Sequence, residues 1–327
     1  MKILVTGGGG FLGTYIVQEL LNRKFEVVNL SRNSYIHLTQ LGVNTLQCDL
    51  SDKGSVAELD LSGIDGVIHT AGIPGVWGAY DKYLKINYHG SINLLEAAKS
   101  AGIKYFVYTS TPSVVFGDED ILNGDEDLSY PDKFYTSYAK TKSMAEKEIL
   151  EANSVELKTL AIRPHLIWGP GDPNLVPRII EKARRGKLKR VGSGDNLVDI
   201  IYVENAASAH VDALTSLMDG NDIGGNAYFI GQESPVKLWD FIDNILTLNK
   251  LSPLSGQISF RAAYIIGWTL EYIYKILGIL SPEPPMTRFV AMQLSKNHYF
   301  SHEKAKEDFG YNPKITTAEG LKRTFST

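Results

Sequence analysis

The chain has little cysteine, no long apolar run and no large excess of charge of either sign. Cys48 is the only cysteine among the 327 residues, which excludes an intrachain disulfide and a cysteine-based zinc site and favours a reducing compartment. The net charge of −4 gives no reason to expect nucleic acid as a partner. The 7 histidines show no His-Glu-x-x-His spacing, so we expect no metal.

The first residues contain no pattern of a secretory signal. The apolar run Ile3-Leu4-Val5 is far shorter than the core of a signal peptide, and a series of glycines follows from Gly7. We therefore expect a cytoplasmic protein.

Short apolar segments alternate with helical patterns through the first half of the chain. The segments are 3–5, 27–30, 45–48, 66–69, 105–109 and 159–162. This alternation predicts an α/β fold with a doubly wound parallel sheet, the Rossmann type. We expect a cofactor domain over 1–168 and a smaller, partly helical substrate lobe over 169–327. Segments near 199–246, among them the strand-like Ala227–Ile230, are expected to rejoin the first domain.

The glycines after the first apolar segment indicate a dinucleotide site. Gly7 allows a tight turn after the strand, and Gly10 allows backbone amides to approach a pyrophosphate. Gly13 lets the next helix pack closely on the sheet, while Phe11 and Leu12 open that helix. The helix N-terminus then offers free N–H groups and a partial positive charge to the phosphates.

The end of the second predicted strand bears on the choice of coenzyme. An NAD site usually has an acid here, which binds the ribose 2′-hydroxyl, but this chain has Ser31 and Arg32. We therefore favour NADP(H) over NAD(H), although Arg32 could instead point into solvent. Asp49 and Leu50 follow the third predicted strand, where Asp49 would face the adenine edge.

Tyr138 and Lys142 are four residues apart and therefore share one face of a predicted helix. A nearby ammonium favours the phenolate, and we expect it to lower the tyrosine pKa towards neutrality for proton transfer. A hydroxyl on the other side of the substrate oxygen is also needed. Ser110, Thr111 and Ser113 follow the fifth predicted strand, and periodicity does not choose among them.

The segment Phe260–Leu280 is mostly apolar but is interrupted by Arg261, Glu271 and Lys275. Its pattern predicts an amphipathic helix, because a charge in the centre of a membrane span is costly. The apolar face could pack on the protein's own core, or it could cover an apolar substrate and lie on a membrane surface. The basic cluster over 182–190 is either a solvated surface or a contact for an anionic substrate or membrane.

Further residues complete a pattern that resembles the extended short-chain dehydrogenases/reductases. They are Cys48-Asp49-Leu50, His69-Thr70-Ala71-Gly72, Asn87, Tyr138-x-x-x-Lys142, Arg163-Pro164, Trp168-Gly169-Pro170-Gly171 and Tyr202-Val203-Glu204-Asn205. The resemblance implies that Ala71, Thr109 and Pro164 also contact the coenzyme. It places the catalytic hydroxyl on Thr111, where the family usually has Ser, and gives Asn87 either a water relay or a bond to backbone.

Within this superfamily, residues 108–114 resemble the branch of 3β-hydroxysteroid and sterol-4α-carboxylate dehydrogenases, and other segments resemble its bacterial members in olefin biosynthesis. The resemblance implies reduction of a lipid-like β-keto acid, a 2-alkyl-3-oxoalkanoate, by a homodimer. Trp77, Ser113 and His165 are candidate substrate contacts; His165 stands where another polar residue, often Arg, is expected. Alternatives are a steroid or sterol-carboxylate dehydrogenase, a nucleotide-sugar epimerase or dehydratase, and a non-catalytic NADP-binding redox sensor.

Overall fold

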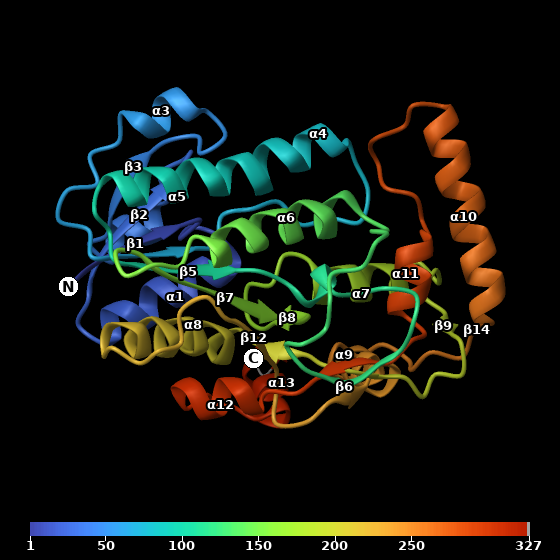
Figure 1. Cartoon of the computed structure of the whole chain (residues 1–327). Helices are drawn as coiled ribbons and strands as arrows, with labels where there is room; N and C mark the ends of the chain where they lie inside the picture. The colour runs from blue at the N-terminus through green and yellow to red at the C-terminus, as the bar shows by residue number, and fades with distance from the viewer. Residues whose placement is uncertain (326–327) are drawn as a thin grey trace.

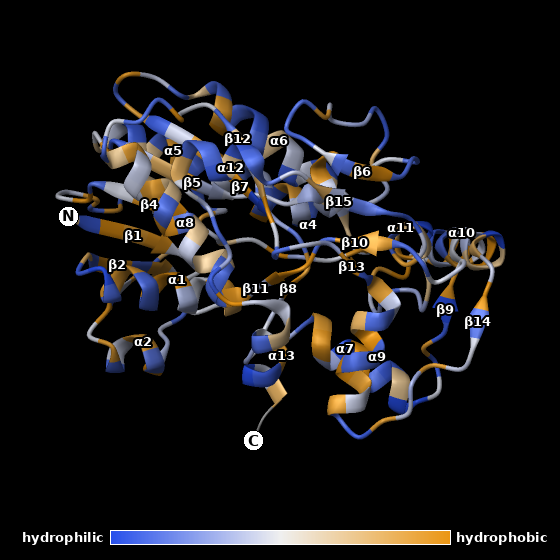
Figure 2. Cartoon of the chain, turned by 90° about the horizontal axis from the view of Figure 1, so that it is seen from below, coloured by the Kyte–Doolittle hydropathy of each residue, from blue (hydrophilic) through white to orange (hydrophobic). Residues whose placement is uncertain are grey.

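The computed structural model describes residues 1–325. At its centre lies a parallel sheet of seven strands in the order β12-β7-β5-β4-β1-β2-β3 (Figure 1). The strands are β1 (Lys2–Thr6), β2 (Glu26–Ser31), β3 (Asn44–Gln47), β4 (Gly66–His69), β5 (Tyr105–Thr109), β7 (Lys158–Pro164) and β12 (Ala227–Ile230). β1 and its neighbours are predominantly hydrophobic, as strands covered on both faces must be (Figure 2). The predicted doubly wound α/β fold is confirmed.

Helices cover both faces of this sheet, and the alternation of side chains along β1 shows how. Ile3 and Val5 belong to the apolar cluster formed with α1 (Phe11–Asn22) and α8 (Val203–Met218). Leu4 points to the other face, into the cluster formed with α5 (Gly90–Ser100) and α6 (Ser137–Glu151). The short helices at the margins are α2 (Ile36–Gln40), α3 (Lys53–Ala57), α4 (Tyr80–Tyr83) and α12 (Glu303–Phe309).

Most of a smaller lobe comes from the second half of the chain, which also returns to the sheet, while β6 of this lobe comes from the first half. Strand β12 pairs in parallel with β7, with Ala227 opposite Ala161. The lobe contains the strands β6 (Ile121–Gly124), β8 (Ile167–Trp168), β9 (Arg190–Val191), β10 (Leu197–Val198), β11 (Ile201–Tyr202), β13 (Val236–Lys237), β14 (Gln257–Ile258) and β15 (His298–Phe300). Its helices are α7 (Leu175–Arg184), α9 (Leu238–Leu248), α10 (Phe260–Ile276), α11 (Arg288–Gln293) and α13 (Thr317–Phe325).

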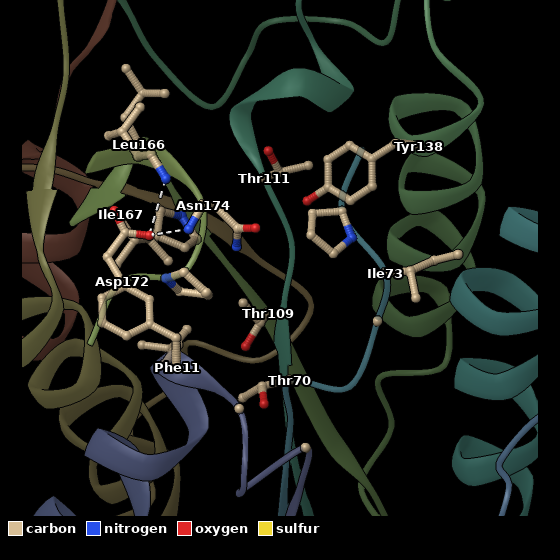
Figure 3. Close-up of a pocket in the computed structure, with 18 of the residues that line it drawn as sticks. Phe11, Thr70, Ile73, Thr109, Thr111, Tyr138, Leu166, Ile167, Asp172 and Asn174 are labelled. Atoms are coloured by element: carbon tan, nitrogen blue, oxygen red, sulfur yellow. Dashed lines mark hydrogen bonds between the residues drawn. The ribbon is translucent and has the colours of Figure 1, made fainter. Parts of the chain in front are cut away.

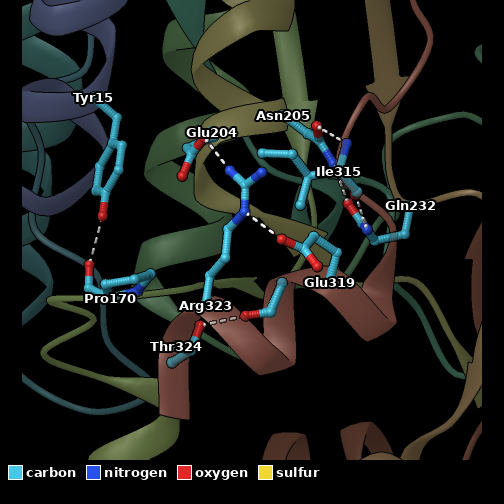
Figure 4. A network of polar contacts seen from close by, with 10 residues as sticks. Tyr15, Pro170, Glu204, Asn205, Gln232, Ile315, Glu319, Arg323 and Thr324 are labelled. Carbon is cyan, nitrogen blue, oxygen red and sulfur yellow. Dashed lines mark hydrogen bonds and ion pairs between the residues drawn. The ribbon is translucent and has the colours of Figure 1, made fainter. Parts of the chain in front are cut away.

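The C-terminal helix α13 fastens the lobe to the sheet domain through polar contacts (Figure 4). Arg323 pairs with Glu204 at the start of α8 at 3.2 Å and with Glu319 at 2.9 Å. The side chain of Asn205 donates to the backbone oxygen of Ile315 at 2.7 Å and accepts from its N–H at 3.1 Å. The Tyr-Val-Glu-Asn segment of the sequence is therefore a junction between the two parts of the chain.

Helix α10 lies at the edge of the molecule (Figure 1), and large apolar residues make up most of its exposed side chains. The residues it buries are small or charged: Ala263, Gly267 and Glu271. Glu271 accepts two hydrogen bonds from the Arg288 guanidinium, at 2.7 and 2.9 Å, which fixes α10 to α11. The exposed side chains of the helix and the turn after it include Ile265, Trp268, Tyr272, Ile273, Ile276, Leu277 and Leu280. The predicted amphipathic helix is present, but its apolar side does not face the protein core.

Candidate active site

A cavity of about 790 Å³ opens at the carboxyl ends of the central strands and continues under the smaller lobe. This is the edge of a doubly wound sheet at which ligands bind. Every residue predicted to contact the coenzyme lines it: Gly7, Gly10, Phe11, Leu12, Gly13, Ser31, Arg32, Asp49, Leu50, Ala71, Thr109, Tyr138, Lys142 and Pro164.

The turn after β1 has the shape that a pyrophosphate needs. Gly7 adopts a left-handed conformation with φ +71°, and a Cβ on Gly13 would collide with the Gly7 carbonyl. Gly10 precedes the first turn of α1 and supplies no side chain to cap it, so the N–H groups of that turn remain free for an anion. The residues present therefore fit a dinucleotide.

The end of β2 forms the side of the cavity at which a coenzyme ribose would lie. Ser31 donates its hydroxyl proton to the backbone oxygen of Asn33 at 2.7 Å, and Arg32 is exposed beside it. Across from them, Asp49 accepts hydrogen bonds from the Ser51 hydroxyl at 2.7 Å and from its N–H at 3.0 Å, which lowers the pKa of the Asp49 carboxyl.

The Tyr-Lys pair stands on α6, whose first turn is capped by the Thr136 side chain. The side chains of Tyr138 and Thr111 lie near each other at the cavity wall (Figure 3), and the Thr111 hydroxyl is close enough to influence the Tyr138 phenol. Lys142 is buried and turns towards β5, where its ammonium donates to the Thr109 carbonyl at 2.6 Å and lies 4.0 Å from the centre of the Tyr108 ring. Among the three candidate hydroxyls, the structure brings Thr111 to the tyrosine.

The pKa values of the pair differ from the sequence-based expectation. Removal from water raises the pKa of Tyr138 to about 12, and the Thr111 hydroxyl opposes this shift. Burial lowers the pKa of Lys142 to about 7, against the influence of Glu146. The expected lowering of the tyrosine pKa is not found in this arrangement, because burial dominates. The phenol keeps its proton at neutral pH and is ready to donate it.

A third buried residue extends the same face of α6, and the sequence analysis missed it. Glu146 lies four residues beyond Lys142 and accepts two hydrogen bonds from Arg163, at 2.6 and 3.0 Å. The hydroxyl of Tyr130 donates to the same carboxylate at 2.7 Å. This ion pair holds α6 against β7, and the continued four-residue spacing was a signal that could have revealed it.

Two predicted site residues lie outside the cavity lining. Asn87 belongs to a π-helical turn (Leu84–His89), and its amide donates to the Ile73 carbonyl at 3.0 Å and accepts from the Ile73 N–H at 2.8 Å. Trp77 donates its indole N–H to the Ile279 carbonyl at 2.9 Å, beyond the end of α10. Asn87 thus holds the cavity loop at Ile73, and Trp77 ties the same loop to the smaller lobe.

The far end of the cavity has mostly apolar walls contributed by three helices of the lobe. The wall residues are Leu175 and Ile179 of α7, Leu238, Phe241 and Ile242 of α9, and Phe289 and Val290 of α11. The predicted substrate contacts Ser113 and His165 also line the cavity. The wall residues were not predicted, because the helices that carry them are distant in sequence and carry no local motif.

A glycine turn for a dinucleotide, together with a Tyr-Lys pair facing the same cavity, defines a nicotinamide-dependent oxidoreductase of the extended short-chain dehydrogenase/reductase type. The sequence profile of the 3-beta hydroxysteroid dehydrogenase/isomerase family matches residues 4–255. The chain belongs to this family.

Relatives with known names resemble the chain over nearly its whole length. A 2-alkyl-3-oxoalkanoate reductase of Stenotrophomonas maltophilia is 42% identical, covering 99% of this chain and 98% of its own. A second reductase of that name, from Shewanella oneidensis, is 44% identical over 98% of this chain and 84% of its own. A mouse sterol-4-alpha-carboxylate 3-dehydrogenase (decarboxylating) is 35% identical, covering 99% of this chain and 90% of its own.

A solved structure shows the same architecture. MoeE5, in complex with UDP-glucose and NAD, superposes with a TM-score of 0.72 at 25% identity, covering 99% of this chain and 97% of its own. The arrangement of sheet and lobe is thus shared with an enzyme fold that accepts a nicotinamide dinucleotide.

Proposed function

We propose that the chain is an NADP(H)-dependent reductase of β-keto acids with long apolar chains, acting on a 2-alkyl-3-oxoalkanoate. The observation that carries this proposal is the composition of one cavity. Its inner end holds the Tyr138 and Thr111 hydroxyls, and its outer end is mostly apolar, with Arg178 and Lys182 of α7 among the lining residues. Polar groups are thus available for one carbonyl oxygen, and apolar walls for an alkyl chain.

The names of the relatives support the substrate class. The two bacterial relatives are named for a 2-alkyl-3-oxoalkanoate, and the mouse relative for dehydrogenation at carbon 3 of a sterol-4-carboxylate. In both substrates the carboxylate is attached to the carbon beside the one that bears oxygen, so each ketone form is a β-keto acid. A sterol-carboxylate dehydrogenase is therefore the second candidate.

The chain's own residues would support reduction of such a ketone. When bound, the reduced coenzyme supplies a hydride for the carbonyl carbon. Tyr138, with a pKa of about 12, remains protonated at neutral pH and donates its proton to the carbonyl oxygen. Thr111 donates a hydrogen bond to that oxygen as negative charge develops on it. The ammonium form of Lys142 stabilises the phenolate that remains.

The preference for NADP(H) rests on the residues after β2. Arg32 follows directly where an NAD site would carry an acid, and it is exposed at the cavity lining. A guanidinium at this place can pair with a 2′-phosphate. Asp49 already accepts two hydrogen bonds from Ser51, so its carboxylate is partly occupied.

A substrate panel tests the proposal. Oxidation of NADPH should be measured with a 2-alkyl-3-oxoalkanoate and its methyl ester, and NADP⁺ reduction with 3β-hydroxysteroids and sterol-4-carboxylates. UDP-glucose forms the remaining arm, with conversion to another sugar nucleotide as the readout. We expect turnover of the β-keto acid. Conversion of the sugar nucleotide without any turnover of ketone or alcohol would reject this proposal and indicate a nucleotide-sugar epimerase instead.

We also propose that α10 contacts the surface of an anionic membrane. Its outward residues Trp268 and Tyr272 are 53% and 58% exposed, as part of a continuous apolar side. Strand β14, directly before α10, pairs with β9, whose Arg190 ends the basic cluster over 182–190. Cations beside an apolar helix face suit anionic lipid headgroups. Within residues 1–325, no helix has the length and apolarity to cross a bilayer.

Vesicle flotation tests this contact. The wild-type protein should float with vesicles of phosphatidylglycerol, and less with vesicles of phosphatidylcholine. Trp268→Glu should reduce binding because it places a charge in the apolar side, whereas the matched change Leu122→Glu, at another exposed apolar residue outside α10, should not. Equal flotation of both variants would reject α10 as the contact.

The remaining expectations follow from the resemblance. We propose a cytoplasmic homodimer that binds membranes peripherally. Light scattering across a range of protein concentrations should give the mass of two chains, and a constant mass of one chain would reject the dimer.

A further inference from the structure

His165 stands in a chain of hydrogen bonds that joins the cavity to the core of the smaller lobe. Its Nε2 lies 2.7 Å from Nδ1 of His298, on β15. The other nitrogen of His298, Nε2, lies 2.9 Å from the backbone carbonyl of Gln293, at the end of α11. Both rings are buried, and both His165 and Gln293 line the cavity.

These contacts fix the proton on each ring. The Gln293 carbonyl can only accept, so His298 must donate from Nε2, and in neutral His298 the Nδ1 is then an acceptor. His165 must therefore donate from its own Nε2. Its remaining nitrogen, Nδ1, is left as an acceptor and makes no hydrogen bond within residues 1–325.

The position of His165 brings it close to the reacting group. Strands β5 and β7 are parallel neighbours, with Thr109 opposite Ile162. Thr111 and His165 therefore follow the carboxyl ends of adjacent strands, whose spacing is about 4.8 Å. Thr111, Tyr138 and His165 all line the same cavity, so a group attached next to a ketone held by Thr111 and Tyr138 lies in the cavity that His165 also lines.

Within residues 1–325, no carboxylate pairs with His165. Its neighbours are His298 and the ring of Phe300, and burial followed by His298 holds the pKa of His165 well below its ordinary value. The nearest acids, Asp199 and Asp120, act on His298 instead. The ring is thus neutral at physiological pH before substrate arrives.

We infer that His165 is the specificity-determining residue that receives the substrate carboxylate, and that it takes up a proton from solvent when the carboxylate binds. This inference rests on the proposed function. The unprotonated Nδ1 of neutral His165 carries a lone pair, which would repel a carboxylate placed beside it. Protonation of Nδ1 converts this repulsion into a charge-assisted hydrogen bond, while the bond from Nε2 to His298 is kept. His298 is the positioning residue.

The pH dependence follows from linkage. The carboxylate raises the pKa of His165 in the complex above its low value in the free protein. At a pH between these two pKa values, His165 therefore takes up one proton when the carboxylate binds. The affinity for the acid then weakens as pH rises, by about tenfold per pH unit within that window. A methyl ester of the same compound has no carboxylate and takes up no proton at His165.

Other charged groups of the cavity must be separated from this effect. Lys142, with a pKa of about 7, and Arg178 and Lys182 of α7 also line the cavity. Lys142 lies at the reacting end of the cavity, so its effect on binding should be the same for the acid and the ester. The difference in proton uptake between acid and ester therefore comes from the group that binds the carboxylate. Substitution of His165 tests whether that group is His165.

Calorimetry on the NADPH-bound protein tests the inference. A 2-alkyl-3-hydroxyalkanoate and its methyl ester are titrated at the same pH in buffers of different ionisation enthalpy. Because the coenzyme is already reduced, the hydroxy acid binds without reacting. We expect uptake of about one proton with the acid and none with the ester. His165→Gln should remove the uptake, and a thermal melt establishes that this variant is folded.

The outcomes are distinct. Binding of the acid without proton uptake, or the same uptake in His165→Gln, overturns the inference; if acid and ester are then both oxidised with NADP⁺, the proposed function stands without it. If neither compound binds nor reacts, the proposed function fails and the inference fails with it. Should His165→Gln not fold, His165→Asn is titrated in its place, and the absence of proton uptake in the wild-type protein overturns the inference whatever the variants do.

Discussion

Replacement of Thr111 by Val tests the geometry of the reacting end most simply. The two side chains have nearly the same shape, so the change removes one hydroxyl from the pair that faces the substrate oxygen. Loss of one donor to a developing oxyanion lowers kcat by about 10²–10³-fold, or roughly 3–4 kcal/mol. We expect a fall in kcat of this size with a smaller change in KM, because the bond strengthens in the transition state.

The structure supplies the controls for this experiment. Thr111→Ser keeps the hydroxyl and should stay within a few-fold of wild type. Ser113→Ala removes a neighbouring hydroxyl that also lines the cavity as a candidate substrate contact, and its effect should fall on KM rather than on kcat. The Thr111 oxygen also accepts from the Ser113 N–H at 3.2 Å, so Thr111→Val should cost about 1 kcal/mol of stability, which a thermal melt measures.

The assay is steady-state oxidation of NADPH with the 2-alkyl-3-oxoalkanoate, followed by absorbance. Coenzyme affinity, measured separately by fluorescence, should be similar in all variants. If Thr111→Val retained the kcat of Thr111→Ser, or if Ser113→Ala lost as much activity as Thr111→Val, the assignment of the oxyanion donor to Thr111 would be refuted.

Three further predictions concern the coenzyme, the proton and the buried ion pair. Tyr138→Phe should abolish turnover and leave the affinity for NADPH nearly intact in fluorescence titrations; retained turnover would reject the proton donor. Arg32→Ala should raise KM for NADPH at least tenfold, the scale of one charge-assisted bond, and leave KM for NADH little changed; equal effects on both coenzymes would place Arg32 away from the 2′-phosphate. Glu146→Gln leaves the buried Arg163 charge without its partner and should lower the free energy of unfolding by about 3–5 kcal/mol in denaturant melts, whereas the same change at exposed Glu151 should not; similar melts would show the pair to be dispensable.

Much of the sheet domain could be predicted because its signals are local. The glycine turn after β1 and the four-residue spacing of Tyr138 and Lys142 each lie within one short segment. Short apolar segments gave the strands for the same reason, since strands covered on both faces must be apolar along their length. The residues predicted for the coenzyme therefore line one cavity, although their contact with a coenzyme stays a prediction.

The substrate end could not be predicted, because it is assembled from distant parts of the chain. Phe241 and Phe289 meet at the cavity from helices that share no sequence pattern. The partner of His165 is His298, more than a hundred residues away, and no spacing rule connects them. The periodicity of α10 predicted the helix, but its orientation depends on the ion pair between Glu271 and Arg288, which only the fold brings together.

The behaviour of the Tyr-Lys pair also required the structure. Spacing places both side chains on one face of α6, but it does not say where the Lys142 ammonium points. The ammonium binds the Thr109 carbonyl, and the burial of the pair decides the direction of both pKa shifts.

The most direct test of the account follows a labelled hydride from coenzyme to product. The protein is incubated with NADPH deuterated at carbon 4 of the nicotinamide, separately on each face, and with a 2-alkyl-3-oxoalkanoate. The account predicts that one of the two labelled coenzymes places deuterium on carbon 3 of the hydroxy acid, and that Tyr138→Phe forms no such product. A hydroxy acid without deuterium from either coenzyme, or no hydroxy acid at all, would contradict it.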